Sequence, residues 1–451
     1  MDTKNLMNDR SLRKKDFICI GYCLVIIGAF IVTAMISFLS EYGIHPDEYD
    51  VKLCMDWCMD RWIWPDMRLT GAGLGNTYSG YGYTKVCNYT PYFLIFSKIA
   101  FVFQKVMGNL PYYRMPNLLL MAVMFVYILK KLKTQNWLML GFGICIQAWY
   151  IFSYVTADAQ DFFLGFFSVV FLADKESILW KALDTGSRRT FYCILLGIMY
   201  GIMLLGKPYY YAILVLTFVV LVGHLVKSEI NIRKPLLARY FLIAGIAVAI
   251  LAGRAAVDLH YYGLDKASAK EQMAEQYCDY DKNPRTPPED QVQTWKMPSK
   301  GYSLPDLFRF EPRWFEKTFR SYVSYSVYID GNNLYYIVMA LLYAAIYIWI
   351  GVYLCRSGDK WIFITGSALI VGNITASVLF SYIYDNQPQG RYLLPVALTV
   401  CYLGAVARDL WKNCIFRMIV LGAACLSVLY FGLYVSRKVI DLGYVRELLR
   451  L

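Results

Sequence analysis

Apolar runs of about 20 residues recur along the chain, and they restrict its fold more than any other feature. A run of this length crosses the hydrocarbon core of a bilayer as an α-helix, because lipid offers the backbone no hydrogen-bond partners. Of the 451 residues, 58% are hydrophobic and 17% are charged, whereas soluble proteins carry about 25% charged residues. The sequence therefore predicts an all-α polytopic membrane protein.

We expect about eleven transmembrane helices in a single membrane domain that covers residues 1–451. Their approximate positions are 17–39, 113–130, 137–153, 161–173, 190–206, 209–226, 238–257, 333–353, 361–382, 391–407 and 416–434. Lys and Arg concentrate in every second connecting segment, which predicts that these segments and the N-terminus are cytoplasmic. The formal charge of +12 is then explained by loops that face anionic lipid, and we expect no nucleic-acid partner.

Two long segments fall on the outer face, residues 40–112 and residues 258–333. Loops of this length usually bind or catalyse something. Within the first segment, Pro91 to Met107 is apolar, and we expect it to be a surface helix or a half-inserted hairpin. A further span there would place the basic clusters outside. One disulfide is possible, without an indicated pairing, among Cys54, Cys58, Cys87 and Cys278.

An acidic motif follows the first expected span. Pro46 suits the first position of a helix, which would place Asp47 and Glu48 in its first turn, where the helix dipole favours anions. Either these carboxylates only cap that helix, or one of them points into a cavity at the membrane surface. A partly buried carboxylate there could act as general base toward an attacking hydroxyl.

A second acidic pair stands at the outer end of the third expected span. Asp158 and Asp161 lie about one helical turn apart, so both can face the same direction. One interpretation is an interfacial turn with a helix N-cap. The other is a site shared with Asp47, because the same face of the membrane is predicted for all three residues.

Cationic residues recur on this face. Lys207 occupies a short outer turn before Tyr209, and Arg391 opens a late span between Gln389 and Tyr392. Each cation is either an interfacial anchor or a ligand for phosphate, which an arginine can bind with two parallel hydrogen bonds. Acids for a base and cations for a phosphate at one interface suit a lipid-phosphate-linked substrate.

Arg254 is a further cation, in the outer third of the span expected at residues 238–257. A charge at this depth requires an anionic partner. Asp258, one turn later, is the obvious structural candidate, and a phosphate is the functional alternative.

Several short motifs resemble, in order, those of the GT-C-type integral membrane glycosyltransferases, which use polyprenyl-phosphate sugars as donors. They are His45–Glu48, Asn88–Tyr92, Thr156–Asp158, Gly206–Pro208 and Gln389–Pro395. More closely, the chain is similar to a bacterial branch of multi-pass proteins of unknown function in that superfamily. The second outer segment departs from this branch, since residues 307–336 keep only a loose aromatic pattern.

The resemblance implies an inverting transfer of a sugar from a polyprenyl-phosphate or polyprenyl-diphosphate donor to a cell-surface glycan. It implies a site on the outer face of the bacterial plasma membrane and a role in cell-wall polysaccharide biosynthesis. Asp47 would be the base, with Glu48 as substitute, and Lys207 and Arg391 would bind the lipid phosphate. Arg254 is a further candidate for the phosphate, because of its charge within the span. The residues expected to contact donor or acceptor are His45, Asp158, Asp161, Tyr209, Gln389 and Tyr392.

Two other functions stay open, a lipid-linked saccharide transporter and a non-catalytic subunit of an envelope-polymer assembly complex. A transporter predicts charges at mid-membrane depth and an internal repeat, whereas here mid-span charges are scarce and no repeat is evident. The sequence requires no cofactor. Mg or Mn is possible, with Asp47, Glu48 and Asp158 as the oxygen ligands.

Overall fold

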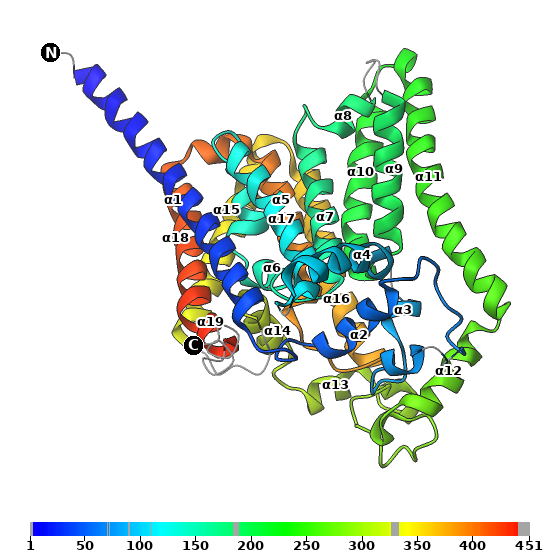
Figure 1. The fold of residues 1–451 in the computed structure, drawn as a ribbon. Helices are drawn as coiled ribbons and strands as arrows, with labels where there is room; N and C mark the ends of the chain where they lie inside the picture. The colour runs from blue at the N-terminus through cyan, green and yellow to red at the C-terminus, as the bar shows by residue number, and fades with distance from the viewer. Residues whose placement is uncertain are drawn as a thin grey trace.

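The computed structural model describes residues 3–69, 71, 73–88, 91–108, 110–183, 189–325 and 333–440, and these residues fold as helices joined by loops (Figure 1). The described part of the chain contains no β-strand. Its extended pairings are two isolated bridges, Tyr78 with Thr84 and Trp295 with Asp385. The predicted all-α class is confirmed.

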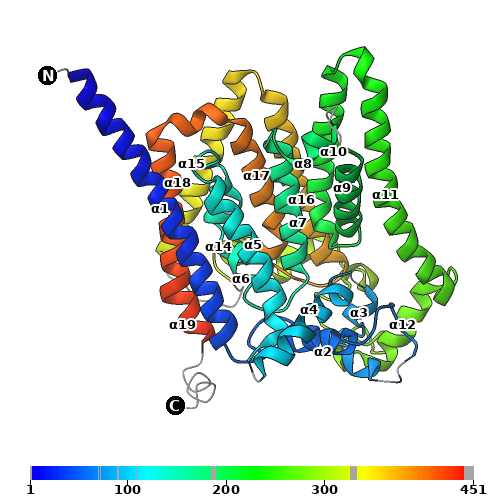
Figure 2. The same cartoon turned by 45° about the horizontal axis from the view of Figure 1, so that its top comes forward.

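Long helices stand side by side and form the body of the molecule (Figures 1 and 2). They are α1 (Thr3–Leu39), α5 (Met115–Lys131), α7 (Asp158–Ala173), α9 (Arg189–Leu204), α10 (Tyr211–Lys227), α11 (Ile230–Tyr262), α15 (Asn333–Ser357), α16 (Lys360–Ile383), α17 (Leu394–Val406) and α18 (Cys414–Tyr430). Short helices α8 (Ile178–Leu183) and α19 (Ser436–Val439) adjoin them.

Seven helical segments of the described chain are long and apolar enough to cross a membrane. They are Phe17–Leu39, Tyr112–Lys131, Pro208–Lys227, Ile232–Tyr262, Asn333–Ser357, Lys360–Ile383 and Cys414–Val439, with Arg189–Leu204 and Gly390–Val406 as shorter apolar helices. The chain is thus a multi-pass membrane protein. The count of eleven spans stays a prediction.

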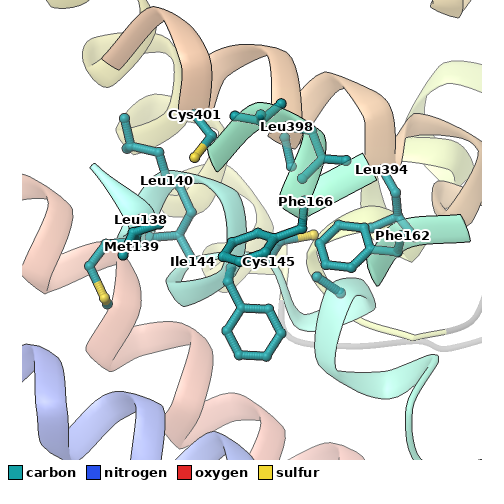
Figure 3. Packing of buried hydrophobic residues seen from close by; sticks show 14 of the residues in the cluster. Leu138, Met139, Leu140, Ile144, Cys145, Phe162, Phe166, Leu394, Leu398 and Cys401 are labelled. Atoms are coloured by element: carbon teal, nitrogen blue, oxygen red, sulfur yellow. The ribbon is translucent and has the colours of Figure 1, made fainter. Parts of the chain in front are cut away.

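The segment expected as the third span, residues 137–153, is not one continuous helix. It contains a π-helical turn, η3 (Met139–Gly143), then an extended residue at Cys145, then the short helix α6 (Ile146–Tyr150). Figure 3 shows apolar residues of this segment against those of α7 and α17. Gly141 permits this contact, because a Cβ there would lie 2.8 Å from the sulfur of Cys401.

Side chains from distant helices satisfy the backbone of this broken segment. The carbonyl of Ile144 accepts hydrogen bonds from the hydroxyls of Tyr343 and Ser427, at 2.7 and 2.9 Å. Directly after the segment, the carbonyl of Tyr154 accepts a hydrogen bond from the amide of Asn117 at 2.6 Å. Irregular backbone at membrane depth is tolerated where protein groups replace the missing helical bonds. The apolar pattern predicts burial correctly, but it cannot predict these remote donors.

The remaining helices gather at one end of the long helices (Figure 1). The first outer segment contributes α2 (Glu48–Cys58), α3 (Lys85–Asn88) and α4 (Pro91–Met107), and the second contributes α12 (Lys266–Tyr277), α13 (Leu304–Phe310) and α14 (Trp314–Val323). The two segments are in contact, since the amide of Asp279 donates to the carbonyl of Gly80 at 2.9 Å. Cys54, Cys58, Cys87 and Cys278 are free thiols.

Pro91–Met107 forms a single helix, α4, that runs across the direction of the long helices in Figure 1. Its Lys98 donates to the backbone carbonyls of Cys58, Met59 and Arg61 at the end of α2. Lys98 therefore satisfies backbone carbonyls at the C-terminal end of the neighbouring helix α2. This geometry agrees with a surface helix and not with a hairpin.

A buried ion pair joins three of these elements. Arg114 ends the turn η2 (Tyr112–Arg114), and its Nε and Nη2 donate to the two carboxylate oxygens of Glu48 at 2.6 and 2.9 Å. Neither side chain has exposed surface. Arg114 Nη1 also donates to the carbonyls of Ser37 and Ser40, at 3.0 and 2.9 Å. One guanidinium thus connects the end of α1 with the beginnings of α2 and α5.

We predict that Glu48→Gln destabilises the protein by about 3–5 kcal/mol, because it leaves the charge of Arg114 buried without its partner. The readout is the unfolding midpoint of the purified protein in detergent. Asp409→Asn is the control, since it breaks an exposed pair with Lys412 and should change the midpoint little. Equal midpoints for Glu48→Gln and wild type would contradict the prediction.

Candidate functional site

Asp47 and Glu48 are adjacent in sequence but point to different environments. Helix α2 begins at Glu48, so the prediction that Pro46 opens the helix is wrong. Asp47 is the N-cap residue, with a left-handed backbone (φ 60°) that is uncommon outside glycine and better tolerated by aspartate than by most residues. Its side chain is 40% exposed and lines a cavity, whereas that of Glu48 is fully buried.

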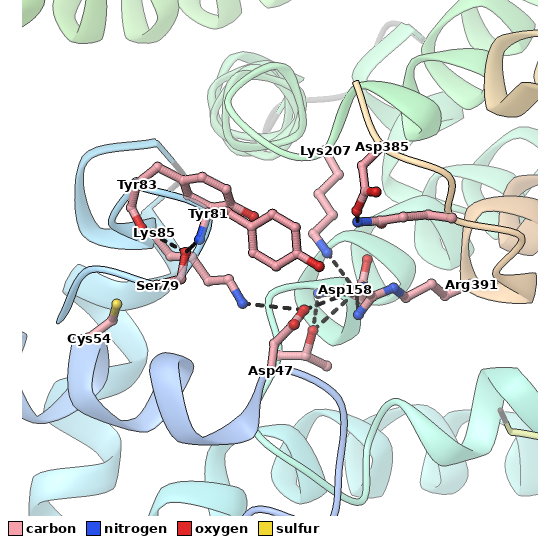
Figure 4. Close-up of polar contacts among 12 residues, drawn as sticks. Asp47, Cys54, Ser79, Tyr81, Tyr83, Lys85, Asp158, Lys207, Asp385 and Arg391 are labelled. Atoms are coloured by element: carbon pink, nitrogen blue, oxygen red, sulfur yellow. Dashed lines mark hydrogen bonds and ion pairs between the residues drawn. The ribbon is translucent and has the colours of Figure 1, made fainter. Parts of the chain in front are cut away.

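Three cations and a second carboxylate surround Asp47 (Figure 4). Its Oδ2 lies 3.3 Å from Lys85 Nζ and 3.4 Å from Arg391 Nη2. Arg391 belongs to the turn η7 (Gly390–Leu393), and its Nη1 lies 3.8 Å from Asp158. Lys207 Nζ pairs with Asp158 at 2.6 Å. Residues from four distant parts of the chain therefore form one charged cluster.

Asp158 and Asp161, at the start of α7, both contact Lys207 of this cluster. Asp158 is fully buried and accepts hydrogen bonds from the hydroxyls of Tyr209 and Thr156 in addition to its ion pairs. Asp161 accepts a hydrogen bond from the backbone amide of Lys207 at 2.9 Å. The two acids share one face, as predicted, but neither lines the cavity. Both position Lys207.

The cavity has a volume of about 280 Å³ and lies between the first outer segment and the ends of the long helices. Among the residues that line it are the charged Asp47, Lys85, Lys207 and Arg391, the amides Gln387 and Gln389, and the aromatic Tyr81, Tyr83, Phe93, Tyr209, Phe380 and Tyr392. Its wall thus combines charged, amide and aromatic groups.

Two buried polar atoms on this wall lack a partner in the described part of the chain. They are the hydroxyl of Ser377 on α16 and the Nε of Arg391. These two residues are 6% and 7% exposed. A buried polar atom without a hydrogen bond costs about 1–3 kcal/mol, so an atom of this kind requires an explanation. A ligand in the cavity with acceptor oxygens would satisfy both donors.

The electrostatics of the cluster favour an anion. Burial alone would raise the pKa of Asp47, but the charges of Lys85, Arg391 and Lys207 outweigh it and lower this pKa below its ordinary value. Burial lowers the pKa of Lys207, and the charge of Asp158 opposes that change. Among the groups joined by these ion pairs, three cations and the carboxylates of Asp47 and Asp158 leave one excess positive charge.

Besides Asp158 and Asp161, three more predicted site residues lie away from the cavity lining, and each has protein partners elsewhere. Glu48 is bound by Arg114. The ring of His45 bonds to the hydroxyls of Ser40 and Tyr150, at 2.8 and 2.7 Å. Arg254 pairs with Asp258 at 2.5 Å, so its partner is this carboxylate and not a phosphate.

The sequence interpretation missed several lining residues, above all Lys85. This lysine follows a turn rich in glycine and tyrosine at residues 79–83, and that composition is the signal that could have identified it. Gly82 has a positive φ of 73°, and a Cβ there would lie 2.5 Å from Ala274 Cα on α12. The second outer segment therefore holds the turn that presents Lys85. Tyr89 and Thr90 of the motif Asn88–Tyr92 lie outside the described residues.

The possible Mg or Mn ligands do not converge. Glu48 is directed to Arg114, while Asp47 and Asp158 each face cations that would repel a metal ion. No group of three potential ligands among the residues that the structure describes could hold a metal. The donor set of these three residues does not fit Mg or Mn.

We predict that Gly390→Ala destabilises the protein by about 1–3 kcal/mol and displaces Arg391. The new Cβ would lie 2.1 Å from the backbone nitrogen of Tyr322 on α14, which cannot rotate away. Gly372→Ala on α16 is the matched control, since its Cβ would enter open space. If both variants unfold at the same temperature in detergent, the close packing of η7 on α14 is contradicted.

No protein-family model, curated protein or solved structure matches the chain. The chemistry of the site is therefore inferred from its own residues. A cationic cluster with free donors can bind an anion, and an ionised carboxylate beside it can accept a proton from a hydroxyl.

Proposed function

We propose that the chain is a glycosyltransferase that moves a sugar from a polyprenyl-phosphate donor to an acceptor hydroxyl at the outer face of the bacterial plasma membrane. The observation that carries this proposal is the convergence of Asp47 with three cations in a cavity at the ends of membrane helices. A phosphate on a membrane lipid would reach this level of the protein, and so would the hydroxyl of a surface glycan.

The cations are suited to hold the donor phosphate. One excess positive charge matches the single negative charge of a phosphodiester. The unpartnered Nε of Arg391 and the hydroxyl of Ser377 would supply two further donors. Such donors stabilise the negative charge that grows on the phosphate as it leaves, and they are already in place before the reaction.

Asp47 is suited to act as the base. In the proposed step, an acceptor hydroxyl loses its proton to Asp47 while its oxygen bonds to the anomeric carbon. The bond from that carbon to the phosphate oxygen breaks, and the lipid phosphate leaves with the electron pair. Without donor, the cations lower the pKa of Asp47. A bound phosphate would offset these cations, so Asp47 would become a stronger base when the donor is present.

The aromatic residues that line the cavity suit a sugar. Tyr209 and Tyr392 pack edge to face, with ring centroids 5.1 Å apart, and Tyr81 and Phe380 also line the wall. Aromatic faces accept the apolar faces of sugar rings, and the amide of Gln389 can bond to sugar hydroxyls.

The outer-face assignment is supported by the distribution of charge along the chain. Lys131 and Arg408, in segments predicted to be cytoplasmic, contact the C-terminal end of α7. Asp158, at the N-terminal end of the same helix, belongs to the cavity cluster. The basic loops therefore lie across the bundle from the cavity, as the Lys and Arg bias requires.

We predict that Asp47→Asn lowers sugar transfer about 10²–10⁴-fold, because the amide cannot accept the proton. The measurement is mass spectrometry of surface glycans and lipid-linked sugars in cells that carry only the variant. One sugar should be missing from the polymer while its lipid-linked form accumulates. Asp60→Asn is the control, since Asp60 is 74% exposed and pairs with Arg61 outside the cavity.

Two results of this experiment would reject the proposal. An unchanged surface glycan in the Asp47→Asn strain would remove Asp47 from catalysis. Accumulation of an entire lipid-linked repeat unit would instead favour transport or polymer ligation.

We predict that Lys85→Gln shifts the acidic limb of the pH profile of kcat/KM to higher pH, by about one unit or more. The sign follows from the charge, because removal of a cation raises the pKa of Asp47 and the base must be ionised to act. Lys52→Gln is the matched control, since Lys52 pairs with Asp56 outside the cavity. An acidic limb that does not move would exclude Asp47 as the titrating base.

A further inference from the structure

A second hollow, of about 420 Å³, lies at the opposite end of the long helices. Its walls come from the end of α5, the turn after α7 and the 3-10 turn η8 (Arg408–Lys412). Helix α7 starts at Asp158 in the charged cluster, and its other end reaches this hollow. The two sites are therefore separated by the length of that helix.

The hollow has a cationic wall. Lys131, Lys175 and Arg408 line it together with the acids Asp174 and Glu176. Asp174 is already engaged, since it accepts hydrogen bonds from Lys131 at 3.4 Å and from the amide of Gln135 at 2.9 Å. In the described part of the chain, Lys175 and Arg408 have no carboxylate within ion-pair distance.

Lys175 and Arg408 are near enough to influence one another. Burial lowers the pKa of Lys175, and the positive charge of Arg408 lowers it further. Lys175 instead lies over the ring of Trp180, 3.3 Å from its centroid, and Arg408 makes a long hydrogen bond of 3.4 Å to the carbonyl of Ala173. Two like charges that share a hollow are stabilised when an anion lies between them.

Acceptor atoms line the same hollow. The side-chain oxygens of Gln135 and Asn136 are buried and have no hydrogen-bond partner among the residues described. A ligand that satisfies them must donate hydrogen bonds as well as carry negative charge. Inorganic phosphate or a simple lipid phosphate supplies the charge, whereas a headgroup with free hydroxyls supplies both.

Two tryptophans in its lining agree with a hollow near the depth of lipid headgroups. Trp137 and Trp411 line it and are mostly buried, at 7% and 8% exposed. Tryptophan is enriched where hydrocarbon meets water, and basic pockets between membrane helices bind anionic headgroups.

We propose that this hollow binds the headgroup of a phosphatidylglycerol-type lipid. The phosphodiester lies between Lys175 and Arg408, and the glycerol hydroxyls donate to the two amide oxygens. The lipid would connect α5, the turn after α7 and η8, which are far apart in sequence. This proposal does not depend on the glycosyltransferase function, because it concerns another site and needs no reaction.

The test measures lipid retention by the full-length protein, purified in detergent, by native mass spectrometry. The protein is titrated with phosphatidylglycerol, phosphatidylethanolamine and phosphatidic acid. Wild type should prefer phosphatidylglycerol, and the double variant Lys175→Gln with Arg408→Gln should bind it about tenfold more weakly. Lys412→Gln is the matched control, since this lysine of η8 is 80% exposed, pairs with Asp409 and should leave binding unchanged.

A second variant tests the hydroxyl contacts. Asn136→Leu should weaken phosphatidylglycerol but leave phosphatidic acid, which lacks the glycerol headgroup, unaffected. Size-exclusion profiles and unfolding midpoints show whether each variant is folded. Equal retention of phosphatidylglycerol and phosphatidylethanolamine by wild type would overturn the proposal. Displacement of phosphatidylglycerol by inorganic phosphate would also overturn it, because the site would then bind a free anion.

Discussion

The ion pair between Arg114 and Glu48 has no exposed surface, and two charges in such a place persist only when all their hydrogen bonds are made. The guanidinium makes them with the carbonyls at the end of α1 as well as with Glu48. The end of the first span and the start of α2 therefore cannot shift independently. Asp47 is placed by this constraint, because it immediately precedes Glu48 and its left-handed backbone turns its side chain into the cavity.

The cluster around Asp47 shows how neighbouring buried cations are kept stable. Lys207 and Arg391 would repel each other in a buried place, but Asp158 lies between them and neutralises part of their charge. Asp158 does not line the cavity, so it does not exclude an anion from the exposed faces of the cations. Asp47, on the open side, is the carboxylate that an incoming phosphate would disturb most. Binding of an anion and the proton affinity of the base are therefore coupled through the same cations.

The sequence predicted much of this arrangement because one physical rule orders it. The bias of Lys and Arg among the loops predicts one face for Asp47, Asp158, Lys207 and Arg391, and the structure brings these four together. The sequence pattern could not show which of Asp47 and Glu48 faces the cavity, since one backbone angle at Asp47 decides it. It also could not show the break in the third expected span, because the donors that satisfy it come from residues almost 200 and 300 positions away.

The second outer segment affects the site indirectly, since none of its described residues lines the cavity. Helix α12 packs against Gly82 in the turn before Lys85, and α14 packs against Gly390, directly before Arg391. In both places the contact is too close for any side chain, so the position of each cation depends on this segment. The distance between Lys85 and Arg391 is then set by how α12 and α14 pack. A segment whose sequence shows only a loose aromatic pattern can therefore be essential to the geometry of the charged cluster, because it acts through backbone contacts that require only glycine on the opposite side.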